Sequence, residues 1–398
     1  MLSTLHAEEV HVGGANITST TGRRFRVDMG TGTASRGDVV RVSEAQGEAS
    51  CASHPSDQPV FSMEEYLPCF DSFGFRVTQD EKILEQQYAR AHPTPTATVR
   101  KWQYVLQHWN DTSMEIKKKL CRQGIPQQYR KQAWSRFLLG GSGKRSRHKG
   151  GEGGSYTDYR DAPLADRQAG DIIERDLDRT FPTHQLFETG SQGAGQRQLR
   201  NILRAYVNYN PQVGYCQGMG FLAATLLLQI ENEENTFWCF CGLMEHEPYE
   251  MKHLYQTGFP GLHMHFFVFE RLLQQTNKKV YQHIHDDHNI NSSFYATHWF
   301  LTVFTYYLNF NLISRIWDRF LCEGWKPVYR IALALLKMDR ALLLSQNTET
   351  GVLLVLKSIQ ENKDPSNMLK ISQQVKFKTS FVNKVKRDYT ASLNNEKQ

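Results

Sequence analysis

Hydrophobic residues recur at helical spacing along most of the second half of the chain. They fall at positions i, i+3, i+4, i+7 and i+8 in stretches that begin at Leu199, Ile313 and Val328. This spacing places the apolar side chains on one face of an amphipathic helix. We find no sustained alternation of hydrophobic and polar residues that would indicate a strand. The pattern therefore predicts an all-α fold.

The composition along the chain predicts four parts. Residues 1–60 are rich in Gly, Ser, Thr and Glu and poor in large apolar residues, which predicts a disordered arm. We expect a helical N-terminal extension at 61–112, a main helical domain at 113–345, and a helical C-terminal end with a basic tail at 346–398. Within the main domain, residues 140–154 read GGSGKRSRHKGGEGG, which predicts a flexible basic loop.

Charge and composition exclude several classes of protein. The 398 residues carry a net charge of +6 without a basic stripe, so no nucleic-acid partner is expected. The 7 cysteines are scattered and the N-terminus lacks an apolar signal-peptide core, which favours free thiols in the cytoplasm. The longest apolar run is shorter than the roughly 20 residues that span a bilayer. Lys144 is followed by Arg145 rather than by Ser or Thr, which argues against a nucleotide-binding loop.

Two short stretches carry candidate chemistry. In the first, Asp176 and Arg179 are three residues apart near the predicted end of a helix, so the carboxylate can hold the guanidinium. An ordinary ion pair on the helix surface explains the same spacing. In the second, Gln217 precedes Gly218 at a predicted helix start, where small residues allow close approach of a ligand or another backbone. A tight turn with Gln217 as a helix cap is the alternative.

Together these stretches resemble the two signature motifs of the TBC family of Rab GTPase-activating proteins. The first motif is Ile-x-x-Asp-x-x-Arg, here Ile173, Asp176 and Arg179, and the second is Tyr-x-Gln, here Tyr215 and Gln217. Further segments resemble the family in the same order, over roughly residues 113 to 345. They are Gly124-Ile-Pro126, Arg130, Trp134, Trp299-Phe-Leu-Thr-x-Phe304, Arg315-Ile-Trp-Asp-x-Phe-Leu-x-Glu-Gly324, Arg330 and Ala332-Leu333.

The resemblance implies two helical subdomains and a role in trans on a Rab-type GTPase in vesicle traffic. Arg179 and Gln217 are the implied catalytic residues, with Asp176, Tyr215 and Gly218 in support. An arginine stabilises charge on the γ-phosphate oxygens, and a glutamine amide orients the attacking water. The GTP and Mg²⁺ belong to the partner, so we expect no cofactor and no independent enzymatic reaction. A helical adaptor that binds a GTPase without stimulating it is the competing interpretation.

Two further features leave alternatives open. His283-Ile-His-Asp-Asp-His288 fits a spacing used by dinuclear zinc hydrolases, but its flanks are helical, so we expect a solvated helix end and no metal. The basic stretch from Lys370 to Arg387 predicts a solvated helix face. Contact with an anionic membrane surface is the alternative, and it would place the protein peripherally on endomembranes.

Overall fold

The computed structural model describes residues 68–398 except 141–153, 165, 189–192, 362 and 396–398, and all of these belong to one compact unit. The predicted arm at 1–60 and nearly all of the basic loop at 140–154 lie outside the described residues. Almost all regular structure in the described part is helical, which confirms the all-α class. No helix in that part is both long and apolar enough to cross a bilayer.

The N-terminal part combines a small hairpin with four helices. Strands β1 (Cys69–Phe70) and β2 (Arg76–Val77) pair antiparallel, a feature that the sequence pattern does not predict within 61–112. The helices are α1 (Gln79–Ala91), α2 (Thr96–Gln107), α3 (Met114–Gln123) and α4 (Gln127–Leu139). Thr78 begins α1 with a capping box, because its hydroxyl accepts from the Glu81 backbone while the Glu81 carboxylate accepts from the Thr78 backbone.

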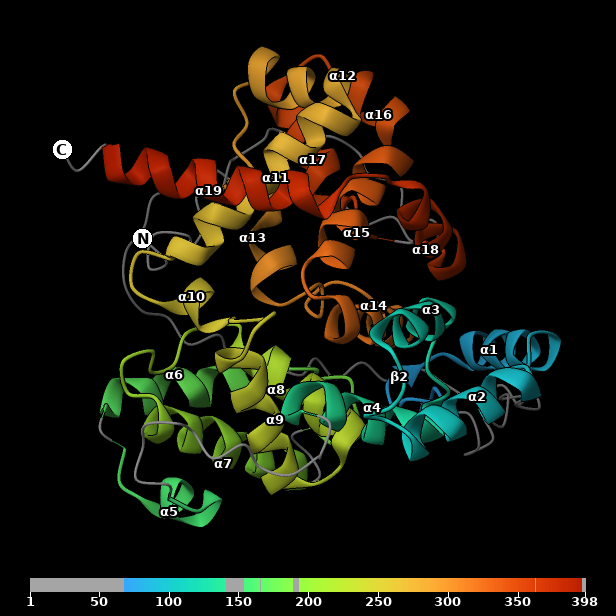
Figure 1. The fold of residues 1–398 in the computed structure, drawn as a ribbon, viewed down its shortest axis with the longest axis vertical. Helices are drawn as coiled ribbons and strands as arrows, with labels where there is room; N and C mark the ends of the chain where they lie inside the picture. Colours follow the sequence, from blue (N-terminus) through green and yellow to red (C-terminus); the bar gives the residue numbers. More distant parts are fainter. Residues whose placement is uncertain (1–67, 141–153, 165, 189–192, 362, 396–398) are drawn as a thin grey trace, which may run out of the picture. The chain divides into compact units, whose positions relative to one another are not determined.

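The first helical group is built around α8. Its members are α5 (Tyr156–Asp161), α6 (Arg167–Leu177), α7 (Ala194–Tyr209), α8 (Met219–Ile230) and α9 (Glu233–Glu245). Helix α8 is apolar on nearly all sides, so it lies buried against α6, α7, α9 and α4. Figure 1 shows this group in the lower part of the view.

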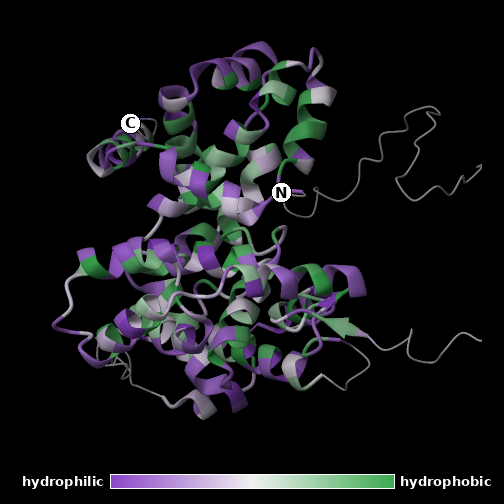
Figure 2. Ribbon diagram, turned by 90° about the vertical axis from the view of Figure 1, so that its right-hand side faces the viewer, coloured by the Kyte–Doolittle hydropathy of each residue, from purple (hydrophilic) through white to green (hydrophobic). Residues whose placement is uncertain are grey.

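The second helical group follows in the chain. Its members are α10 (Lys252–Tyr255), α11 (Pro260–Thr276), α12 (Lys278–Tyr281), the π-helical turn η4 (Gln282–Asp287), α13 (Ser293–Leu301), α14 (Phe310–Glu323), α15 (Lys326–Met338), α16 (Arg340–Leu344), α17 (Glu349–Ser358), α18 (Pro365–Gln374) and α19 (Thr379–Asn395). Helix α15 packs on α14 and α18, and α11 packs on α13 and α19. The two groups confirm the predicted pair of helical subdomains (Figure 1). Figure 2 shows green and purple positions along the same helices, as amphipathic packing requires.

The stretch predicted as a basic tail is a packed part of the second group. It covers the end of α18 and much of α19, and Val382 and Val385 of α19 are buried. These two valines are buried and α19 packs on α11, whereas Lys378 and Lys384 are exposed. This stretch therefore includes a docked helix, with exposed basic residues on it and in the segment before it.

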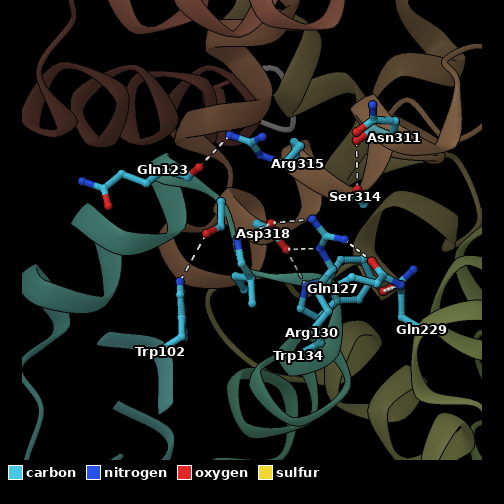
Figure 3. A network of polar contacts seen from close by, with 12 residues as sticks. Trp102, Gln123, Gln127, Arg130, Trp134, Gln229, Asn311, Ser314, Arg315 and Asp318 are labelled. Carbon is cyan, nitrogen blue, oxygen red and sulfur yellow. Dashed lines mark hydrogen bonds and ion pairs between the residues drawn. The ribbon is translucent and has the colours of Figure 1, made fainter. Parts of the chain in front are cut away.

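Helix α14 ties the N-terminal helices to the second group through a buried carboxylate. Asp318 is fully buried and accepts from the Ile125 backbone at 2.9 Å, Arg130 Nε at 3.0 Å and Trp134 Nε1 at 2.9 Å (Figure 3). On the same helix, Arg315 donates to the backbone oxygen of Gln123 at 2.8 Å, where α3 ends. A cation there stabilises the negative end of the α3 dipole.

Candidate functional site

Arg179 lies in the turn that follows α6, one turn after the buried carboxylate that holds it. Helix α6 ends at Leu177, so Arg179 is just beyond the helix end on which the sequence places it. Its guanidinium contacts Oδ1 of Asp176 through both Nε and Nη2. The Arg179 side chain is 38% exposed, whereas that of Asp176 is only 2% exposed. Because Asp176 is buried, the pair is not the ordinary surface ion pair that spacing alone also allowed.

The second oxygen of Asp176 binds the segment that carries Gln217. Oδ2 accepts from the Tyr215 hydroxyl at 2.5 Å and from the Gly218 backbone N–H at 3.3 Å. Burial raises the pKa of Tyr215 well above its usual value, and the charge of Asp176 raises it further, so the hydroxyl stays a donor. One carboxylate thus brings together all five residues that the sequence singled out.

Two glycines allow the start of α8 to lie against the end of α6. Gly218 has a φ of +102°, a left-handed conformation that favours glycine, at the N-cap of α8. A Cβ atom on Gly220 would lie 3.0 Å from the Thr180 hydroxyl oxygen and 3.3 Å from that of Tyr215. The backbone of α8 can therefore approach the α6 turn this closely only without a side chain at position 220.

Gln217 is exposed and does not cap α8. The N-cap residue is Gly218, and no side chain among the described residues caps this helix start. The alternative in which Gln217 serves as a cap is therefore wrong. Its amide extends from a segment that is anchored on both sides, by Tyr215 and by Gly218, to the same carboxylate.

Sequence reasoning missed a histidine on α13, whose C-terminal end lies against the start of α8: the Thr302 methyl group is 3.5 Å from the Cβ position of Gly218. His298 of α13 is partly buried. Burial lowers its pKa, and the positive charge of Arg179 lowers it further, so the ring is neutral at pH 7. Its ring stacks on Tyr306 at 4.7 Å between centroids. No signal in the sequence links His298 to this site, because only tertiary packing brings α13 next to the start of α8.

The histidine motif at 283–288 forms no evident metal site. His283 to Asp287 lie in the π-helical turn η4, where His283 Nδ1 is 3.7 Å from an oxygen of Asp287. Within the described residues, no group of three or more His, Cys, Asp or Glu side chains is placed to hold a metal ion. Nothing in this segment supports the zinc-hydrolase alternative.

Comparison with known proteins places this geometry in a family. The model of the Rab-GTPase-TBC domain matches residues 127–344, which include both candidate motifs. The chain belongs to the Rab-GTPase-TBC domain family. Among this family's members, it is 36% identical to Carabin of Mus musculus over 60% of this chain and 52% of that protein. It is 30% identical to growth hormone-regulated TBC protein 1 of Xenopus tropicalis over 72% of this chain and 82% of that protein.

The fold of this TBC-family chain also has solved counterparts. The TBC domain of a Chlamydomonas flagellar RabGAP superposes with a TM-score of 0.58 at 22% identity, over 78% of this chain and 100% of that one. At this identity, the likeness concerns the fold. The chain spans about half the length of the mouse relatives Carabin (52%) and TBC1 domain family member 10A (51%).

Proposed function

We propose that this chain is a GTPase-activating protein for a Rab-type small GTPase and so regulates vesicle traffic. The observation that carries the proposal is the carboxylate of Asp176. One of its oxygens binds Arg179, and the other binds the backbone beside Gln217. Membership of the Rab-GTPase-TBC domain family supports the same function. The Rab protein itself holds the GTP and Mg²⁺.

Arg179 and Gln217 are the two catalytic residues, called the fingers below, and each has a separate role in hydrolysis. Phosphoryl transfer from GTP spreads charge over the γ-phosphate oxygens, and catalysis consists mainly of positioning and electrostatic stabilisation. Asp176 occupies two N–H groups of Arg179, which leaves the other donors of the guanidinium for the phosphate. Gln217 accepts from and donates to the attacking water in place of the GTPase's own glutamine. The contacts of Asp176 hold both groups before the partner arrives.

The test measures GTP hydrolysis by a panel of GTP-loaded Rab proteins with and without this chain. For the Rab that responds, Arg179→Lys keeps the charge but loses the planar fork, so stimulation should fall by about 10²-fold or more. Gln217→Ala should cause a comparable loss. The two losses should not add in the double variant, since both residues serve one transition state.

Matched controls lie on the same segments. Arg175→Lys and Gln212→Ala change exposed residues near each finger and should leave activity unchanged. A Rab whose own glutamine is replaced by Leu should still respond to the wild-type chain. Full activity of Gln217→Ala would instead leave an arginine-only mechanism. Binding of a Rab without any stimulation would favour the adaptor alternative.

The exposed basic residues between position 370 and position 387 add a proposed location. Lys370, Lys376, Lys378, Lys384 and Arg387 are all exposed. Such residues attract an anionic membrane surface by about 1 kcal/mol each when they lie close to it. We therefore infer peripheral contact with endomembranes. Sedimentation with vesicles tests the contact, and equal binding to neutral and anionic vesicles would refute it.

A further inference from the structure

Three exposed aromatic rings and one partly buried histidine lie beside the start of α8. Phe294 and His298 lie four residues apart on one face of α13, and Tyr306 and Tyr307 follow the helix. Tyr306 stacks on His298 at 4.7 Å and packs edge-on against Tyr307 at 4.7 Å. Phe294, Tyr306 and Tyr307 are 64%, 45% and 40% exposed. We refer to these four residues as the aromatic platform.

The platform lies against the start of α8, next to the segment that carries Gln217. The Tyr306 ring lies 5.1 Å from that of Phe221, which is one turn after Gln217 on α8. The methyl group of Thr302 would be 3.5 Å from a Cβ atom on Gly218. The positive charge of Arg179 also lowers the pKa of His298, after the larger effect of burial. The rings therefore lie beside the segment on which Gln217 is exposed.

The backbone that presents the two tyrosines is conformationally costly. Val303 and Phe304 have φ angles of +47° and +66°, and both side chains are fully buried. Left-handed backbone at a β-branched residue is an outlier that persists only where the surroundings enforce it. This turn buries Val303 and Phe304 and leaves the next two aromatic side chains, Tyr306 and Tyr307, exposed.

We propose that the aromatic platform is a docking surface for apolar side chains of the GTP-bound Rab, and that it sets affinity rather than the rate of the chemical step. The proposal rests on the proposed function. If the two fingers reach the γ-phosphate, the GTPase surface around its nucleotide must cover their neighbours. A standard interface of about 800 Å² per partner corresponds to a disc about 16 Å in radius, which includes side chains in contact with α8 and the α6 turn.

The chemistry of the platform matches such an interface. Exposed tyrosines supply large contact areas and few rotamers to immobilise, and aromatic residues are enriched among those that dominate binding energy. His298 is neutral at pH 7, so the platform itself carries no charge there. Its attraction for the partner is consequently apolar, and it should depend little on salt.

The experiment separates affinity from chemistry. With the Rab that responds most strongly to the wild-type chain, Tyr306→Ala and Tyr307→Ala should each raise KM by about 10-fold, and kcat should stay within about 2-fold. Tyr306→Phe should restore a near-normal KM, because the ring rather than the hydroxyl makes the contact. Arg179→Ala should show the opposite split, with kcat lost.

A matched control is available on α2. Tyr104 is 59% exposed and stacks on His108 at 4.3 Å, as Tyr306 does on His298, so Tyr104→Ala should change neither constant. Tyr307→Gln removes the ring but leaves a larger side chain than alanine, and it replaces Tyr307→Ala if thermal melting shows that the alanine variant is unfolded.

The outcomes distinguish this inference from the function on which it rests. If the wild-type chain stimulates no Rab, the proposed function fails and the inference fails with it. If the wild-type chain is active and Arg179→Ala is inactive, but the Tyr306→Ala/Tyr307→Ala double variant keeps its KM, only the docking inference is overturned. A double variant that loses kcat at constant KM overturns it as well.

Discussion

Replacing Asp176 by Asn tests whether one carboxylate positions both fingers. Asparagine keeps the shape of the side chain but has one acceptor oxygen, no charge, and an NH₂ group that would face other donors. The buried bond from Tyr215 to the carboxylate contributes about 1.5–3 kcal/mol, as expected for a charged acceptor. The pair with Arg179 adds less than about 1 kcal/mol, since that side chain is 38% exposed and solvent screens it. We therefore expect a loss of roughly 2–4 kcal/mol in the free energy of unfolding.

The effect on activity should be larger than the effect on stability. The one acceptor oxygen of asparagine can serve either Arg179 or the Gly218 anchor, so the two groups are no longer held together. A displacement of about 1 Å costs about 10²-fold in rate, and an arginine finger contributes about 10³ to 10⁵. We expect kcat/KM for Rab-bound GTP to fall by at least about 10²-fold.

Single-turnover hydrolysis of preloaded GTP and urea denaturation measure the two effects of Asp176→Asn separately. Asp178→Asn changes an exposed carboxylate two residues away and should be silent in both assays. Tyr215→Phe removes only the hydroxyl bond and gives a milder perturbation of the same site. A folded Asp176→Asn variant with near-normal kcat/KM would refute the positioning role.

Two further predictions concern stability. Asp318→Ala should lower the free energy of unfolding in urea by about 3–5 kcal/mol, because it leaves Arg130 buried without its partner, whereas Asp161→Ala at an exposed pair should have no measurable effect. His265 is buried against the Tyr329 hydroxyl, and burial holds its pKa well below 6.5. The unfolded chain therefore binds the extra proton below pH 6.5, and stability should fall by about 2 kcal/mol between pH 6.5 and 5. A His265→Gln variant with an equally steep pH slope would contradict that assignment.

Local periodicity predicts the elements whose apolar face is complete within one segment. Helices such as α7, α14 and α15 follow directly from it, because apolar residues recur at every third or fourth position and are buried there. The hairpin of β1 and β2 is too short to produce an alternating pattern. Helix α19 buries only Val382 and Val385, so its docking on α11 leaves almost no trace in the sequence.

The site shows the same division between local and tertiary information. The three-residue spacing of Asp176 and Arg179 predicts their contact, but it does not reveal that the carboxylate is buried. The bonds of its second oxygen to Tyr215 and Gly218 depend on how α8 packs on α6. The place of His298 and Tyr306 beside them likewise depends on tertiary packing.

The absent side chain at Gly220 has a consequence for judging which related sequences are active. A methyl group there would press on the hydroxyl oxygens of Thr180 and Tyr215 at 3.0 and 3.3 Å. Either the α6 turn or the start of α8 would have to yield, and the separation of the fingers would change with it. A relative could thus retain the arginine and the glutamine, pass a motif search, and still be a poor activator. The ability of such a sequence to activate a GTPase is better judged from all three positions: the glycine, the arginine and the glutamine.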